Sequence, residues 1–161
     1  MGDVGKLSHL AASGAARMVD ISGKQPTRRT ARAEAWVRVG ASVAARLRAG
    51  DTPKGNALET ARLAGILAAK RTAELIPLCH PLPLEVVEVQ AELVGTQVHL
   101  ETRVCGEGKT GVEMEALVAA AVAALTVYDM CKSADKGIEI ERVRLLEKSG
   151  GKSGTWRRQC D

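Results

Sequence analysis

The sequence predicts an α+β fold, a ferredoxin-like two-layer sandwich with an antiparallel sheet and helices on one face. Segments with strand-like and helical periods follow one another in the order strand, helices, strand, strand, helix, strand, which is typical of a split βαβ arrangement. The chain has 161 residues, a length that suits one core of normal size. Residues 1–161 are therefore expected to form a single domain.

The first strand is expected at residues 29–39, where charged or polar residues alternate with apolar ones. Residues 1–16 are small and polar, carry no hydrophobic period, and are expected to form a mobile leader. Residues 18–22 are a candidate to pair with the first strand.

Two helices are expected next. A short one covers residues 42–49, because Gly50 and Asp51 close it. A longer one covers residues 56–75, where Asn56 followed by Glu59 resembles a capping box.

An extended, proline-braced loop is expected after the longer helix, because proline cannot continue a helix. Its prolines flank Leu78, Cys79 and His80, and they are Pro77, Pro81 and Pro83. Two alternating segments, residues 84–94 and 97–105, then predict a hairpin turning at Gly95.

The last elements are a helix at residues 112–132, a strand at 138–146 and a flexible basic tail at 147–161. Within this helix, Ala116–Leu125 contains only Ala, Val and Leu. A helix that is apolar all round must be buried all round, and a sheet covers only one side. The stretch is shorter than the roughly 20 residues that cross a bilayer, so self-association is the expected cover.

Composition restricts the function. The net charge of +4 suits an anionic partner, but the chain has no Phe, two Trp and one Tyr, too few aromatics for the stacking platforms of nucleic-acid modules. We therefore expect no nucleic-acid partner. Four cysteines without a C-x-x-C pair predict reduced thiols, and the absence of a secretory pattern predicts a cytoplasmic protein with no membrane association.

Two glycine-rich segments invite nucleotide-binding interpretations. Gly106–Gly111 fits G-x-G-x-x-G, but a doubly wound sheet needs further βαβ units, so a tight turn and a phosphate-facing loop both stay open. Lys148–Gly154 lacks the first glycine of a P-loop and the helix that must follow it. A flexible cationic arm and a solvated tail are the remaining interpretations.

Few side chains have the spacing of a catalytic or metal site. Cys79 and His80 are adjacent and point apart, so no metal site is expected, and His80 is either a structural hydrogen-bond partner or a substrate contact. Asp129 and Lys132 stand three apart on one helix face. They are either a surface ion pair or, following an apolar stretch, a partly buried pair in which burial lowers the pKa of the lysine for acid–base work.

Several long strings in the sequence together resemble the MoaC family of cyclic pyranopterin monophosphate synthases, over about residues 7–156. They are Met18–Ser22, Lys54–Gly55, Ala64–Ile66 with Ala69–Thr72, Leu75–Leu82, Thr110–Leu117, Ala124–Lys132 and Val143–Gly154. The resemblance implies a lyase of molybdenum cofactor biosynthesis that converts 3′,8-cyclo-7,8-dihydro-GTP to cyclic pyranopterin monophosphate and releases pyrophosphate. It also implies a ferredoxin-like fold assembled as a hexamer of dimers, with the site at the dimer interface.

Family residues carry over position by position. Asp129 and Lys132 match the acid–base pair. The positions that match substrate contacts are Leu78, Cys79, His80, Glu113, Met114 and Glu115. The positions that match basic residues, which would neutralise a triphosphate, are Lys24, Arg29, Lys54, Lys70, Lys148 and Lys152. No cofactor is expected, and a divalent ion accompanying the triphosphate is left open.

These assignments predict a site made by two chains. Glu115 and Asp129 lie on one expected helix, 14 residues apart, which at 1.5 Å per residue separates them by about 21 Å. One compact substrate does not span that distance, so one chain's helix start is expected beside another chain's helix end. The alternative to an enzyme is a regulatory module that binds a nucleotide triphosphate without turning it over.

Overall fold

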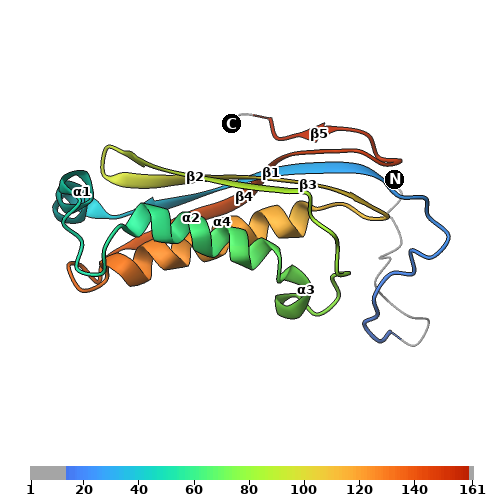
Figure 1. Cartoon of the computed structure of the whole chain (residues 1–161), viewed down its shortest axis with the longest axis horizontal. Helices are drawn as coiled ribbons and strands as arrows, with labels where there is room; N and C mark the ends of the chain where they lie inside the picture. Colours follow the sequence, from blue (N-terminus) through green and yellow to red (C-terminus); the bar gives the residue numbers. More distant parts are fainter. Residues whose placement is uncertain (1–13, 160–161) are drawn as a thin grey trace.

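A computed structural model describes residues 14–159 and has the α+β sandwich expected from the sequence (Figure 1). A five-stranded antiparallel sheet, ordered β2-β3-β1-β4-β5, carries α2 and α4 on one face. The elements in chain order are β1 (Thr27–Arg38), α1 (Gly40–Ala49), α2 (Ala57–Ala69), α3 (Thr72–Leu75), β2 (Val86–Val94), β3 (Gln97–Gly108), α4 (Glu113–Cys131), β4 (Glu139–Ser149) and β5 (Trp156–Arg157). Most of the expected leader, residues 1–13, lies outside the described residues.

β1 lies at the centre of the sheet because its alternation directs only small aliphatic side chains to the helices. These side chains are 0–1% exposed, and they are Ala31, Ala33, Ala35 and Val37. β1 pairs antiparallel with β3 on one side and with β4 on the other. The prediction that residues 18–22 pair with this strand is wrong, since both sides of β1 are occupied and the segment forms no strand.

The helix expected as one piece over residues 56–75 is two helices. Asn56 caps α2 as predicted, its side chain accepting a hydrogen bond from the Glu59 backbone N–H at 3.1 Å. The break comes at Arg71, whose backbone leaves helical geometry at φ −116° and ψ 15°. The Thr72 hydroxyl donates to the Ala69 carbonyl at 3.0 Å. This side-chain hydrogen bond replaces the backbone N–H that a continuous helix would have offered to that carbonyl.

α4 packs on the sheet beside α2, and many of the side chains that it buries are alanines (Figure 1). Helix α2 approaches so closely that a Cβ at Gly65 would lie 2.9 Å from the Ala119 carbonyl oxygen. α2 of the same chain therefore covers much of the apolar helix, a cover that the sequence did not predict, while self-association stays a prediction. Leu125 remains 58% exposed.

Two strands run further than their alternation predicted. The hairpin turns at Gly95 as expected, with φ 61°, and β3 continues to Gly108. β4 continues to Ser149, and β5 adds a short edge strand paired to it. The segment from residue 147, expected as a flexible basic tail, thus contributes to two strands of the sheet.

The face of the sheet opposite α2 and α4 carries ion pairs. Glu34 is 6% exposed and accepts from Arg144 at 2.7 Å, and it also contacts the His99 ring at 2.9 Å. His99 stacks on Trp36 with ring centroids 4.3 Å apart. These contacts give His99 a structural role on this face.

Candidate active site

The residues matched to substrate contacts meet in one cavity of about 380 Å³ at the start of α4. The proline-braced loop supplies Leu78, Cys79 and His80, while the first turn of α4 supplies Glu113, Met114 and Glu115. The rest of the lining is Val19, Ile21, Lys24, Leu82, Thr110 and Gly111. Three segments that are far apart in sequence therefore form one concave surface.

Backbone contacts hold the proline-braced loop in place. The Cys79 N–H donates to the Ile76 carbonyl at 3.0 Å, and the Glu85 N–H donates to the Cys105 carbonyl at 2.9 Å. The loop crosses β3 at Gly106, where a Cβ would lie 2.6 Å from the Pro83 carbonyl oxygen. Gly106 thus serves close backbone packing, while Gly111 at the other end of the glycine motif lines the cavity.

Glu115 is the most unusual group of this cavity. It is only 3% exposed, and its Oε2 has no hydrogen-bond partner. Burial raises the pKa of Glu115 to about 7, and the nearby charge of Glu113 adds to the effect. Burial also raises the pKa of the Cys79 thiol, with a further contribution from Glu115. A buried carboxylate without a partner is costly, which is typical of a group that waits for a ligand.

Glu115→Gln is expected to stabilise the free protein. The folded pKa of about 7 lies above the ordinary 4.5. Ionisation of this carboxyl therefore lowers the free energy of unfolding as pH rises from about 4.5 through 7. The variant should gain up to about 3 kcal/mol in free energy of unfolding near pH 8, and under about 1 kcal/mol near pH 5. Urea unfolding at equal protomer concentration measures both. Equal gains at the two pH values would contradict the assignment.

A second cavity of about 380 Å³ adjoins the first through Lys24, which lines both. Its lining is cationic and rich in backbone, and consists of Lys24, Gln25, Thr27, Arg29, Gly151 and Lys152. Arg29 donates from Nη1 to the Gly150 carbonyl at 3.1 Å, which orders the guanidinium beside the glycine loop. Lys148 contacts Glu113 at 2.9 Å. Four of the matched basic residues thus gather around these two cavities.

Lys70 lies at a third, smaller cavity of about 120 Å³ at the α2–α3 break. This cavity shares Leu82 and Glu115 with the first one. Arg71 also lines it, so two cations lie on the far side of the buried carboxylate.

The matched acid–base pair lies at the opposite end of α4. Asp129 contacts Lys132 and Lys54, each at 2.7 Å. Hydrogen bonding to Lys132 first, and then to Lys54, lowers the pKa of Asp129 to about 2, while the hydrogen bond to Asp129 raises the pKa of Lys132. The expectation of a partly buried pair with a lowered lysine pKa is wrong for the single chain, because both side chains are 51% exposed.

One chain does not bring the two groups together. Glu115 is in the first turn of α4 and Asp129 is in the last, and a straight helix separates them by about 21 Å. The matched residues therefore form two clusters: Lys54, Asp129 and Lys132 at the end of α4, and all others near its start. Sequence reasoning missed Val19 and Ile21 as lining residues, because the segment was interpreted as a strand.

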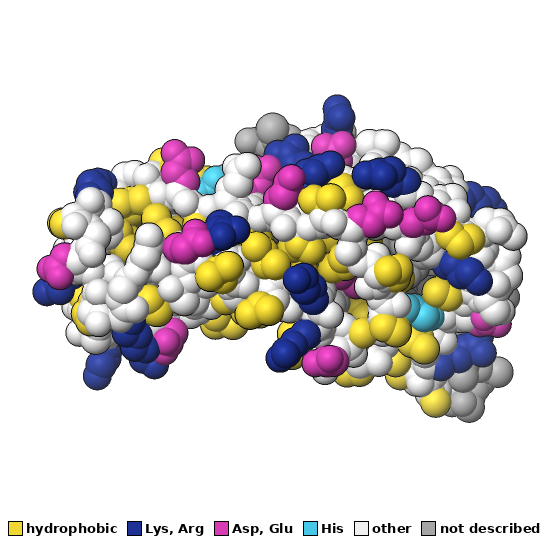
Figure 2. Space-filling model, viewed as in Figure 1, with side chains coloured by type: hydrophobic (Ala, Val, Ile, Leu, Met, Phe, Trp, Pro, Cys, Tyr) yellow, Lys and Arg dark blue, Asp and Glu magenta, His cyan; other side chains and the backbone are white. Residues whose placement is uncertain are grey.

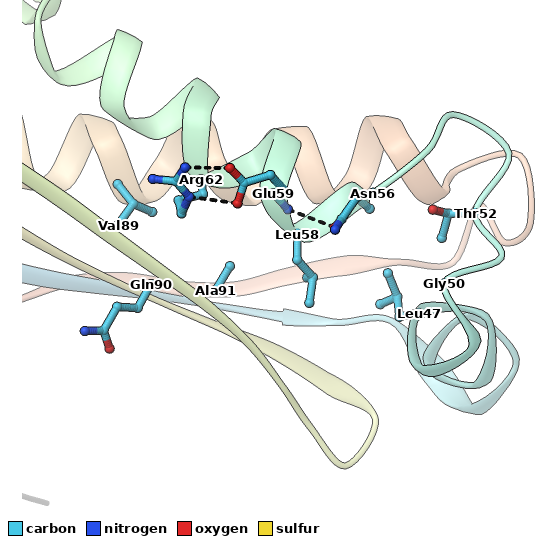
Figure 3. A pocket seen from close by; sticks show the side chains of 11 residues that line it. Leu47, Gly50, Thr52, Asn56, Leu58, Glu59, Arg62, Val89, Gln90 and Ala91 are labelled. Atoms are coloured by element: carbon cyan, nitrogen blue, oxygen red, sulfur yellow. Dashed lines mark hydrogen bonds and ion pairs between the residues drawn. The ribbon is translucent and has the colours of Figure 1, made fainter.

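A larger cavity of about 580 Å³ contains none of the matched residues. It lies between α1, the start of α2 and β2, with Leu47, Leu58 and Val89 in its lining. Its charged groups, Glu59 and Arg62, satisfy each other (Figure 3). The volume is large, but no unpaired charge of this lining points to a ligand.

An apolar stripe runs along the outer surface of the helices. Leu63 and Leu67 of α2 are 50% and 57% exposed, and Leu125 of α4 is 58% exposed. Figure 2 shows hydrophobic side chains gathered over this region. Among residues 14–159, no group of three or more His, Cys, Asp or Glu side chains is placed to hold a metal ion.

Comparison with known proteins identifies relatives over nearly the whole chain. The model of the MoaC family matches residues 18–151. A protein of Methylobacterium sp. (strain 4-46) named cyclic pyranopterin monophosphate synthase is 57% identical over 154 residues, covering 93% of this chain and 95% of its own length. Proteins with the same name from Thermomicrobium roseum and Novosphingobium aromaticivorans are 54% and 50% identical, covering 97% and 94% of this chain and 95% and 96% of their own lengths.

Proposed function

The chain belongs to the MoaC family, and from that membership and the geometry of its site we propose that it is an enzyme of molybdenum cofactor biosynthesis. It converts 3′,8-cyclo-7,8-dihydro-GTP to cyclic pyranopterin monophosphate and releases pyrophosphate. The observation that carries the proposal is the adjacency of a cavity for a ring, lined by Leu78, Met114 and Glu115, to a cationic cavity suited to phosphates.

Besides the rearrangement of the ring, the reaction closes a cyclic phosphate, and the bond changes at the α-phosphorus define what the side chains near the phosphates must do. A substrate hydroxyl bonds to the α-phosphorus, the bond from that phosphorus to the β-phosphate oxygen breaks, and pyrophosphate leaves. The hydroxyl proton needs an acceptor and the leaving group needs neutralisation. Asp129 and Lys132 supply a hydrogen-bonded acid–base pair. Lys24, Arg29 and Lys152 supply positive charge for the phosphates.

The active unit is proposed to contain at least two copies of the chain, consistent with a hexamer of dimers. The start of α4 from one copy and the Asp129 cluster from another make one complete site. Three observations support this: the length of α4, the exposure of Asp129 and Lys132, and the apolar stripe at Leu63, Leu67 and Leu125. A partner that covers the exposed pair would remove water from it, which strengthens its electrostatic interactions.

Turnover of the cyclised GTP substrate tests the function. Purified protein should release one pyrophosphate for each cyclic pyranopterin monophosphate formed, measured by coupled phosphate detection and chromatography. Heat-denatured protein is the control. Tight binding of the substrate without release of pyrophosphate would instead identify a nucleotide-binding regulatory module.

Removing Arg29 of the cationic cavity or Lys54 of the Asp129 cluster should weaken substrate binding. Arg29→Ala and Lys54→Ala are each expected to raise the Kd about tenfold or more at low ionic strength, because each loses a charge-assisted contact. The effect should shrink near 0.5 M salt, roughly, because ions screen the charges. Arg46→Ala removes an exposed cation of α1 and is the matched control, expected to bind as the parent does. Parent-like binding of both site variants at low salt would make these residues ordinary surface cations.

A further inference from the structure

The two glycine-rich segments, Gly106–Gly111 and Lys148–Gly154, meet at the side chain of Arg29. The guanidinium donates from Nε to the Gly108 carbonyl at 3.4 Å and from Nη1 to the Gly150 carbonyl at 3.1 Å. Gly108 is the last residue of β3, and Gly150 directly follows β4. Arg29 lies on β1, the strand that pairs with both. Its guanidinium therefore bridges the two segments from the strand between them.

Gly151 forms the surface against which this guanidinium lies. Its φ of 70° is in the left-handed region, and the three atoms nearest to a Cβ at this position would all belong to the Arg29 guanidinium. The Cβ would overlap the guanidinium, so both could not keep their places. The guanidinium is the far end of a flexible side chain and would move more easily than the backbone. A side chain at residue 151 would therefore push Arg29 out of its hydrogen bonds.

The position of Arg29 matters because it lines the cationic cavity together with Gly151 and Lys152. A guanidinium has five N–H donors, and two of its nitrogens are engaged by the backbone carbonyls. The remaining donors are left for an anion in the cavity. Since the side chain is already ordered, it loses little rotamer freedom when the anion binds.

We propose that Gly151 is a positioning residue for phosphate binding: the absence of a side chain there holds the Arg29 guanidinium between two backbone carbonyls, ordered in advance for an anion. The inference rests on the proposed function for the identity of that anion, the phosphates of the substrate and the pyrophosphate that leaves. Gly154 provides a matched comparison within the same loop. It has a similar left-handed conformation, with φ 64°, but nothing lies within 4 Å of a Cβ placed there.

Calorimetry with pyrophosphate on the full-length chain tests the proposal. Gly151→Ala is expected to raise the Kd about tenfold, because the displaced guanidinium loses a charge-assisted contact with the anion. Gly154→Ala has a similar backbone strain without the overlap, and it should bind within about threefold of the parent. In an Arg29→Ala background, Gly151→Ala should change the Kd by less than about twofold, since the side chain through which it acts is absent.

Urea unfolding without ligand gives an independent measurement, at equal protomer concentration. Gly151→Ala should lower the free energy of unfolding more than Gly154→Ala does, and this difference should vanish in the Arg29→Ala background. Backbone strain alone would affect the two glycine variants equally. Equal Kd values for these variants, a loss or an unfolding difference that persists in full without Arg29, or a parent that does not bind pyrophosphate would each overturn the proposal. Failure of the proposed function shows separately, as absence of product formation from the cyclised GTP substrate by the parent.

Discussion

Lys132→Ala is expected to abolish product formation, lowering kcat/KM by roughly 10²–10⁴-fold or more, the range for loss of a positioned acid or base. The Lys132 ammonium lies 2.7 Å from the Asp129 carboxylate. Its side chain is 51% exposed and therefore is not part of the buried core. The fold should therefore survive the substitution. Pyrophosphate release measures the activity, and circular dichroism with thermal unfolding measures the fold.

Two further variants make the result specific. Asp129→Asn should have a similar effect, because it keeps the shape of the side chain and removes the charge that Lys132 and Lys54 contact. Lys136→Ala removes an exposed lysine a few residues further on, and it should retain near-parent turnover. Normal product formation by well-folded Lys132→Ala protein would refute the catalytic assignment.

Mixed oligomers of two inactive variants should recover about a quarter of the parent activity. Lys132 lies at the end of α4, whereas His80 lines the cavity at its start, so a two-chain site takes these residues from different copies. In a statistical mixture of Lys132→Ala and His80→Ala chains, about half of the dimers are hybrids. Each hybrid holds one intact site and one doubly damaged site, which gives roughly a quarter if the sites act independently.

The measurement requires dissociation, mixing and reassociation, with native mass spectrometry to show that hybrids formed. Each variant taken alone through the same treatment is the control. Arg29→Ala in place of His80→Ala repeats the test with a residue of the cationic cavity. Absence of recovery in proven hybrids would place the tested residues on one chain, and a fully active monomer would end the shared-site model.

The elements predictable from the sequence are those whose pattern is local. The alternation of residues 29–39 predicts a strand because period two allows only one buried face, and that face is Ala31, Ala33, Ala35 and Val37. The capping position Asn56 and the hairpin glycine Gly95 likewise act through their own backbones. The order of these elements then limits the topology to a ferredoxin-like sheet.

Features that depend on distant partners could not be predicted. The break at Arg71 follows a helical pattern without a proline or glycine, so no local signal marks it. β4 extends to Ser149 because β1 pairs with it as far as Thr30. The residues at that end of β4 are polar and do not show the alternation that predicts a strand. The cover of α4 by α2 depends on the absence of a Cβ at Gly65, and this role shows only in the packed pair.

The family resemblance identified the residues of the site, and the structure shows where each of them lies. No pattern in the sequence separates Glu113 from Glu115, both in the first turn of one helix. Packing makes one of them an ion-pair partner of Lys148 and leaves the other buried with a free acceptor. The exposure of Asp129 and Lys132 contradicts the burial inferred from the apolar stretch before them.

The close contact of α2 at Gly65 makes α4 behave as a stiff rod, since backbone rests almost directly on backbone near Ala119. In the two-chain arrangement, this rod starts in one active site, with Met114 and Glu115, and ends in another, with Asp129. In that proposed arrangement, a tilt of α4 that bound substrate imposed at the first end would reach the acid–base pair of the neighbouring site. Occupancy of one site and geometry of the next would then be thermodynamically linked, equally in both directions.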